Sequence, residues 1–287
     1  MGAISQLFGY LLNALYTVFN NYGIAIIIFS IILRIILIPV TVKQQKSLKK
    51  SAELQEEMKE IQRKYKNNPE KLNQETIDLY KREKLSPFAG CFSSIIQLII
   101  ILAVFWLVSE PLTYMKKIDE SVINDYKTQI QQENGQTTYT EIAIINKFGA
   151  QDERVHLNMD FLGLDLSKVP SSNLNDWTVY VIPVLYVISS VASIRITNNF
   201  NNRKKKEKQK VITDGKEVEL KEEPSELEAM EAMNKNMMYM LPLMSVFIAF
   251  IAPLGLALYW FVSNVLMIIE KIIIELIMRH KEEKQNA

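Results

Sequence analysis

The sequence is poor in the residues that build catalytic and metal centres. It holds one cysteine and two histidines among 287 residues. The single cysteine, Cys91, cannot form an intramolecular disulfide and argues against a thiolate metal cluster, so we expect it to be buried among apolar neighbours. A Gly-rich phosphate-binding loop with its lysine is also missing, which argues against ATP hydrolysis. We therefore expect no catalytic residues, no metal and no cofactor.

Charge is balanced overall, with a net charge of +1, but charged and apolar residues are segregated along the chain. Apolar residues form long blocks at 24–42, 88–109, 177–194 and 236–278. The last block would span about 65 Å as one helix, roughly twice the hydrocarbon thickness of a bilayer, and Pro253 and Gly255 interrupt it. We therefore predict two spans there and an all-α integral membrane protein with five transmembrane helices.

One fixed positive charge, Arg34, lies inside the first apolar block. A guanidinium in the hydrocarbon slab costs about 2.5 to 3.5 kcal/mol on insertion scales and cannot lose its proton. Ser30, Arg34 and Thr41 share one helical face, which predicts that this face lines a water-filled space. We expect Arg34 to have water and helices, and not acyl chains, as its neighbours; an acidic partner that leaves no room beside Arg34 would argue against this. A structural role remains the alternative, with Arg34 tied to a neighbouring helix or snorkelling to the interface.

The distribution of lysine and arginine predicts the orientation, because these residues accumulate on the cytoplasmic side. Segment 43–85 has 12 basic and 8 acidic residues, whereas segment 110–176 has 6 basic and 11 acidic residues. Basic residues also follow the third and fifth spans. We therefore place the N-terminus outside and the C-terminus in the cytoplasm of a multi-pass protein of the cell membrane.

The predicted organisation alternates spans with polar segments. Residues 1–22 have helical apolar spacing and predict an amphipathic helix on the outer surface. Residues 43–85 predict a cytoplasmic hairpin of two helices that meet at a turn near Pro69. The remaining predicted segments are spans at 23–42, 86–110, 176–197, 236–252 and 253–278, an external segment at 111–175, a cytoplasmic loop at 198–235 and a cytoplasmic tail at 279–287.

Several polar residues lie within the other predicted spans. Ser93 and Gln97 share a face of the second span, where Gln97 either bonds to a neighbouring helix or lines a polar cavity. In the third span, Ser190 stands beside a series of small hydroxyl residues whose expected role is close helix packing.

The fifth span has two polar faces. Tyr259, Ser263 and Glu270 share one, and the adjacent one carries Trp260, Asn264 and Lys271. We expect Glu270 and Lys271 near the cytoplasmic boundary. In the external segment, Asn134 and Gly135 predict a β-hairpin turn.

Five stretches resemble the YidC/Oxa/Alb family of membrane protein insertases, in the order of that family. They touch all five predicted spans and leave out mainly residues 116–155 and 211–230. The stretches are RIILIPVTVKQQKSLKK, KYKNNPEKLNQETIDLYKREKLSPFAGC with the IIQ that ends at Gln97, FLGLDLSK, MMYMLPLMSVFIAFIAPLGLALYW and VSNVLMIIEKIII.

The resemblance implies a five-helix core around a hydrophilic groove that opens to the cytoplasm and to lipid. It assigns the groove's positive charge to Arg34 and matches Gln97 and Trp260 to family positions. The partners that it implies are nascent membrane proteins and membrane lipids, with the Sec translocon, components of the signal recognition particle pathway and the ribosome as further candidates, and no DNA. Together with the polar residues of the spans, we expect the groove to be lined by Arg34, Ser30, Gln97, Ser93, Ser190, Trp260, Ser263 and Asn264.

The predicted function is membrane protein insertion without catalysis. An anion or solute transporter that binds its substrate at Arg34 is the alternative, although it predicts internal repeats with broken helices, and we find no convincing repeat. An intramembrane serine protease is remote, because His156 and His280 both fall outside the predicted spans.

Overall fold

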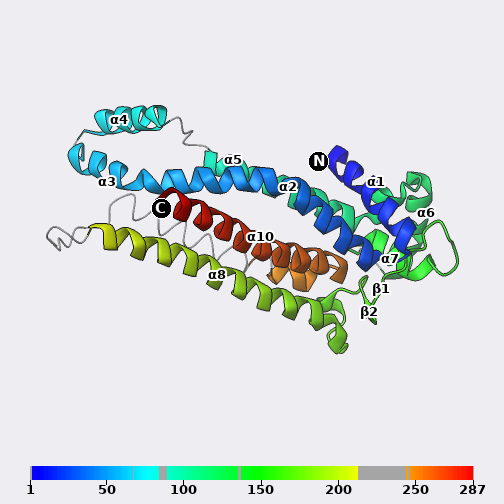
Figure 1. Ribbon diagram of the computed structural model, residues 1–287. Coiled ribbons are helices and arrows are strands. Elements are labelled where there is room, and N and C mark those ends of the chain that lie inside the picture. Colours follow the sequence, from blue (N-terminus) through cyan, green and yellow to red (C-terminus); the bar gives the residue numbers. More distant parts are fainter. Residues whose placement is uncertain are drawn as a thin grey trace. The chain divides into compact units, whose positions relative to one another are not determined.

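The computed structural model describes residues 2–66, 68–83, 89–134, 137–212, 244 and 246–286, and over this part of the chain it is mostly helical (Figure 1). Most of the predicted loop at 198–235 and of the fourth span at 236–252 lies outside the described residues. The chain divides into two compact units. Unit 1 contains residues 1–34 and 103–287, and unit 2 contains residues 35–102.

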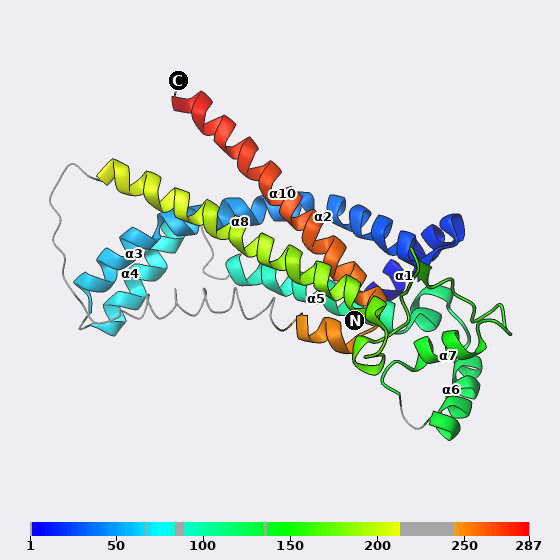
Figure 2. The same ribbon diagram turned by 90° about the horizontal axis from the view of Figure 1, so that it is seen from below.

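Two long helices lie side by side in unit 1, as both ribbon views show (Figures 1 and 2). They are α8 (Val181–Ile212) and α10 (Leu254–Asn286). Helix α2 (Tyr22–Glu53) contributes its first turns to the same unit. Tyr22–Lys43 and Trp177–Asn199 are each long and apolar enough to cross a bilayer, whereas Leu98–Ser109 is apolar but shorter.

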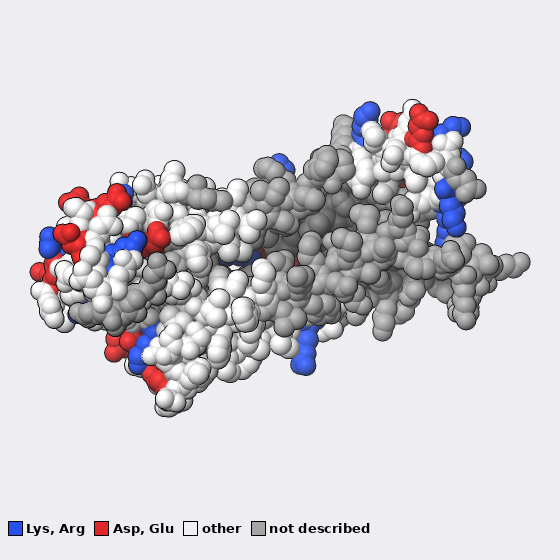
Figure 3. Space-filling view, turned by 180° about the vertical axis from the view of Figure 1, so that it is seen from behind, with Lys and Arg blue, Asp and Glu red and all other residues white. Residues whose placement is uncertain are grey.

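The helices of unit 1 expose many large apolar side chains. Val184, Ile188 and Val191 recur at helical spacing on α8, and Ile273 and Ile277 do so on α10. Figure 3 shows the same division: charged atoms gather over residues 110–176, at the left of the view, and the described surface beside them is nearly all white. Extended apolar surfaces of this kind are unfavourable in water and are covered by lipid in membrane proteins.

Helix α1 (Gly2–Phe19) packs closely against the rest of unit 1. A Cβ atom on Gly9 would clash with the carbonyl of Tyr114, in the short π-helix η1 (Leu112–Lys116). The buried hydroxyl of Ser5 donates to the carbonyl of Ala103 at 3.0 Å, and the rings of Phe8 and Phe29 pack edge to face with centroids 5.6 Å apart. Its other face exposes apolar residues, among them Leu7 and Val18.

The polar segment (residues 110–176) forms a small lobe with two helices and a β-hairpin. The helices are α6 (Glu120–Asn134) and α7 (Thr140–Phe148), so the β-hairpin that we predicted around Asn134 is wrong. The observed hairpin consists of β1 (Asp160–Phe161) and β2 (Leu164–Asp165), paired antiparallel. Its turn contains Gly163, in the left-handed conformation with φ of 77°. Two short 3-10 helices, η2 (Pro170–Ser172) and η3 (Trp177–Tyr180), lead into α8.

The lobe holds the N-terminal ends of α2 and α10. The amide of Tyr22 donates to the carbonyl of Asn158 at 3.0 Å. The amides of Leu254 and Gly255 donate to the carbonyls of Lys168 and Leu166, each at 2.9 Å. These bonds satisfy amides that a helix N-terminus leaves unpaired. The predicted interruption at Pro253 is confirmed, because α10 begins at the next residue.

Unit 2 contains the rest of α2, most of α5 (Ala89–Ser109) and a pair of short helices, α3 (Gln55–Lys64) and α4 (Pro69–Arg82). The side chain of Asn68 caps α4 by accepting from the amide of Lys71 at 3.1 Å, and proline follows it at the first helical position. An ion pair between Glu57 and Arg82 joins α3 to α4. The two helices therefore form a helical hairpin.

Candidate functional site

The charged residue of the first apolar block is paired inside unit 1. Arg34, on α2, forms an ion pair with Glu270, on α10. The side chain of Arg34 is 17% exposed and that of Glu270 is 7% exposed. Such a pair, between two long apolar helices, costs desolvation energy for both groups, which only close contact can repay.

The pair is made through Nε of Arg34 and one carboxylate oxygen of Glu270. Among the described residues, neither carboxylate oxygen of Glu270 nor Nε of Arg34 has a hydrogen-bond partner. Two further polar residues, Tyr259 and Lys271, lie within electrostatic range of Arg34.

Arg34 therefore has an acidic partner but keeps some exposure, and its tie to a neighbouring helix agrees with the structural alternative. Sequence reasoning placed Glu270 at the cytoplasmic boundary and did not connect it to Arg34. The available signal was the spacing of Tyr259, Ser263 and Glu270, which identified a polar face on α10 but not the helix that this face meets.

Ser30, one turn before Arg34, is buried, and its hydroxyl donates to the carbonyl of Ile26 in its own helix at 2.7 Å. Thr41 makes the equivalent bond to Leu37 at 3.2 Å. Both hydroxyl protons are thus used locally, so Ser30 can offer a ligand only its oxygen lone pairs.

Helices α8 and α10 are joined by a row of polar contacts. The amide nitrogen of Asn264 donates to the hydroxyl oxygens of Ser189 at 2.9 Å and Ser190 at 3.2 Å. Two turns further along α10, the ammonium of Lys271 donates to Thr197 at 3.1 Å. The structure therefore brings together the predicted residues Ser190 and Asn264 and adds Ser189 and Thr197, two of the small hydroxyl residues of the third span that we expected to serve helix packing.

The remaining predicted site residues fall into two groups. Trp260 is half-buried beside Tyr186, with ring centroids 6.4 Å apart, and Ser263 is hydrogen-bonded to Tyr259. The side chains of Ser93 and Gln97 lie outside the described residues.

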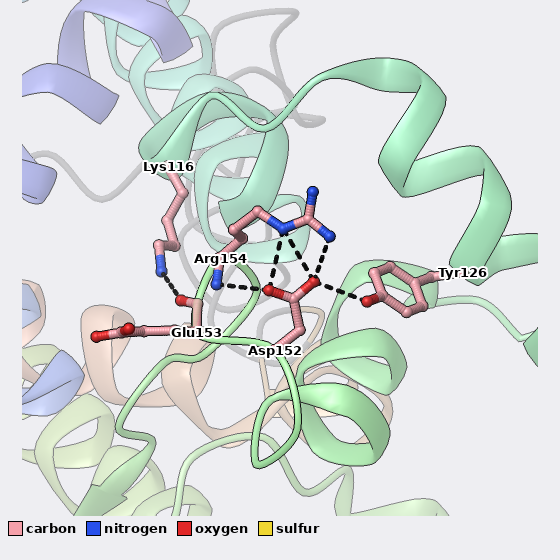
Figure 4. A network of polar contacts seen from close by, with 5 residues as sticks. All are labelled: Lys116, Tyr126, Asp152, Glu153 and Arg154. Carbon is pink, nitrogen blue, oxygen red and sulfur yellow. Dashed lines mark hydrogen bonds and ion pairs between the residues drawn. The ribbon is translucent and has the colours of Figure 1, made fainter.

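A second polar network lies in the polar segment (Figure 4). The carboxylate of Asp152 accepts two bonds from Nε of Arg154, both at 3.0 Å, one from Nη2 at 2.7 Å and one from the hydroxyl of Tyr126 at 2.7 Å. These bonds, those from Arg154 first, hold the pKa of Asp152 well below its usual range. Lys116 donates to the carbonyls of Glu153 and His156 at 3.1 and 2.8 Å. The network ties α6, η1 and the loop after α7 together.

Glu141 is a buried carboxylate with several bonds in the same lobe. It accepts from the amides of Leu112 at 2.7 Å and Thr113 at 3.1 Å, and from the hydroxyl of Thr113. Burial raises its pKa, and the bonds from Thr113 and Leu112 oppose that rise. The contacts anchor the start of η1.

A surface hollow between α7 and residues 165–173 is lined by none of the residues predicted for the groove.

The long helices have exposed apolar faces, and an ion pair joins two of them, α2 and α10. These features are those of an α-helical membrane protein. The particular family follows from comparison with known sequences. The family described as 60Kd inner membrane protein matches residues 14–282, nearly the whole chain. The chain belongs to this family, and the resemblance to the YidC/Oxa/Alb insertases is confirmed.

Several relatives carry the name membrane protein insertase YidC. The protein of Fusobacterium nucleatum is 26% identical over 93% of this chain and 93% of its own length. That of Treponema denticola is 26% identical over 96% of this chain, which spans only 38% of that relative. That of Caldanaerobacter subterraneus is 39% identical over 37% of this chain and 51% of its own length.

Proposed function

We propose that this chain is a membrane protein insertase, as its relatives are named. It inserts nascent membrane proteins, and helps them fold, without enzymatic chemistry and with or without the Sec translocon. Names among the relatives lend no support to an anion transporter. The observation that carries the proposal is a permanently charged Arg34 that keeps some exposure inside the otherwise apolar block at residues 24–42.

The proposed architecture has five transmembrane helices, with the N-terminus outside and the C-terminus in the cytoplasm. The polar segment lies outside, and the hairpin of α3 and α4 lies in the cytoplasm, where it meets incoming chains. The excess of basic residues in segment 43–85 and of acidic residues in segment 110–176 supports this orientation.

The proposed substrate path is a hydrophilic groove open to the cytoplasm and to lipid. We assign its lining to the residues named from the sequence, namely Arg34, Ser30, Gln97, Ser93, Ser190, Trp260, Ser263 and Asn264. A polar client segment then moves part of the way across the bilayer without leaving water, and Arg34 attracts its carboxylates. The client's apolar segment moves into lipid, and its burial, at about 25 cal/mol per Å², drives the step.

The test compares Arg34→Ala with Arg34→Lys in reconstituted vesicles. We expect Arg34→Ala to lower insertion of a single-span client with an acidic external tail at least tenfold, because the groove loses its charge. Arg34→Lys retains the charge and should insert this client at close to the normal rate. Protease protection of the tail measures insertion, and normal insertion by both variants would refute the role of Arg34.

A second measurement follows the substrate path directly. Photocrosslinkers at positions 34, 97 and 260 should each capture a stalled nascent membrane protein. Crosslinks confined to lipid would leave the proposed groove without a client.

A further inference from the structure

Glu270 is an unusual residue for its position on α10. It lies 16 residues after the start of the helix, about 24 Å along its axis, with Ile269 before it and Lys271 followed by three isoleucines after it. A carboxylate among such residues carries an insertion cost comparable with that of Arg34. Its side chain is nearly inaccessible, and the ion pair with Arg34 compensates for its burial.

The contacts of Glu270 differ from those of two carboxylates in the polar segment. Glu141 accepts three hydrogen bonds, and Asp152 is bonded to Arg154 and Tyr126. Glu270 accepts none among the described residues, although a carboxylate can accept about four. A pair that fixes a fold gains its strength from charge-assisted hydrogen bonds. A pair made through one nitrogen and one carboxylate oxygen can exchange one carboxylate for another.

We infer that Glu270 is an internal competitor for Arg34, which a client carboxylate must displace before it binds. This inference rests on the proposed function and specifies how its site is regulated. Glu270 and the client each present a carboxylate, so the two cannot both pair with the guanidinium of Arg34 at the same time. Displacement leaves Glu270 beside Lys271, whose ammonium is already within its electrostatic range.

The consequence is that a client needs several carboxylates to displace Glu270 efficiently. A polar segment with several carboxylates offers Arg34 a high local concentration of the competing group, whereas a single carboxylate competes poorly with a permanently tethered one. Glu270 thereby selects clients with multiply acidic external segments over weakly acidic ones.

The experiment measures insertion of matched single-span clients with zero, one, two or three acidic residues in the external tail. We expect Glu270→Gln to raise insertion of the one-carboxylate client at least threefold, and to leave the neutral client unchanged. Glu275→Gln is the matched control, because Glu275 is a similarly buried acid on the same helix. It should leave the whole series unchanged.

A double variant separates the inference from the proposed function. Arg34→Ala combined with Glu270→Gln should behave like Arg34→Ala alone, since a competitor has no effect once its target is gone. If Arg34→Ala inserts acidic clients normally, the proposed role of Arg34 fails. If Arg34→Ala is defective but Glu270→Gln matches the wild-type protein for every client, only the competitor fails.

Two other outcomes also decide the matter. Equal loss of insertion for all clients in a folded Glu270→Gln protein would make Glu270 a support for Arg34 and overturn the inference. If Glu270→Gln does not accumulate, Glu270→Asp weakens the pair and retains the charge. It must then raise insertion of the one-carboxylate client, and the absence of that rise would equally refute competition.

Discussion

The same two chemical groups, a carboxylate and a guanidinium, meet in two regions of this protein in different ways. In the polar segment, Asp152 and Arg154 share several hydrogen bonds, and Tyr126 adds another. Between α2 and α10, Glu270 and Arg34 share charge without a hydrogen bond among the described residues. The first arrangement fixes one geometry. The second joins one nitrogen to one carboxylate oxygen, which suits the exchange inferred above.

Among the substitutions that sharpen this comparison, we expect the largest loss of folding stability from Glu141→Ala. Glu141→Ala removes the acceptor for two backbone amides, and a buried donor left unpaired costs about 1 to 3 kcal/mol. Thermal unfolding in detergent, with hydrogen exchange of residues 112–118, should show the loss. Glu153→Ala, an exposed acid of the same lobe, is the control. Equal stability of the two variants would mean that the bonds of Glu141 do not anchor η1.

A smaller effect is expected for the polar row between α8 and α10. Asn264→Ala loses two hydrogen bonds to serine, and such bonds between membrane helices contribute about 0.6 to 2 kcal/mol. A double-mutant cycle with Ser189→Ala isolates the coupling in unfolding experiments. If the coupling free energy between Asn264 and Ser189 equals the destabilisation caused by Glu141→Ala, the comparison fails. The contact between α8 and α10 would then be as strong as the contacts of the lobe.

The smallest effect is a pH dependence confined to the polar segment. The bond from Lys168 lowers the pKa of Asp176 from 3.8 to about 2, and Arg154 lowers that of Asp152. A carboxylate whose folded pKa is depressed stabilises the fold fully above its unfolded pKa. The contribution of Asp176 should therefore be lost as pH falls from about 4 to about 2. Hydrogen-exchange protection factors in residues 112–176 measure this loss.

Asp152→Asn together with Asp176→Asn should remove most of that pH dependence. Glu141 does not contribute to the loss of stability at low pH, because its pKa is raised. Its contribution has the opposite sign: it is present below the unfolded pKa and declines as pH rises through the folded pKa. Protection factors that stay constant between pH 4 and 2 in the wild-type protein would contradict the assignment of Asp152 and Asp176.

Local signals in the sequence predicted much of the fold. The turn predicted near Pro69 indicated the start of α4, and Pro253 indicated the break before α10. The turn signal at Asn134 failed because its flanking residues follow helical preferences on both sides, so it joins α6 to α7. The β-hairpin at residues 160–165 has strands of two residues each, which are too short for alternation to reveal.

By itself, the sequence determined where long apolar helices form and that one of them carries a charge at Arg34, because hydropathy and helical spacing are local properties of the chain. Only the tertiary structure decided that Glu270 is the partner of that charge. The two residues are far apart in the sequence, and their meeting depends on how α2 and α10 pack and on the rotation of each helix about its axis. That rotation is set by the combined packing of many side chains, which no spacing rule within one helix contains.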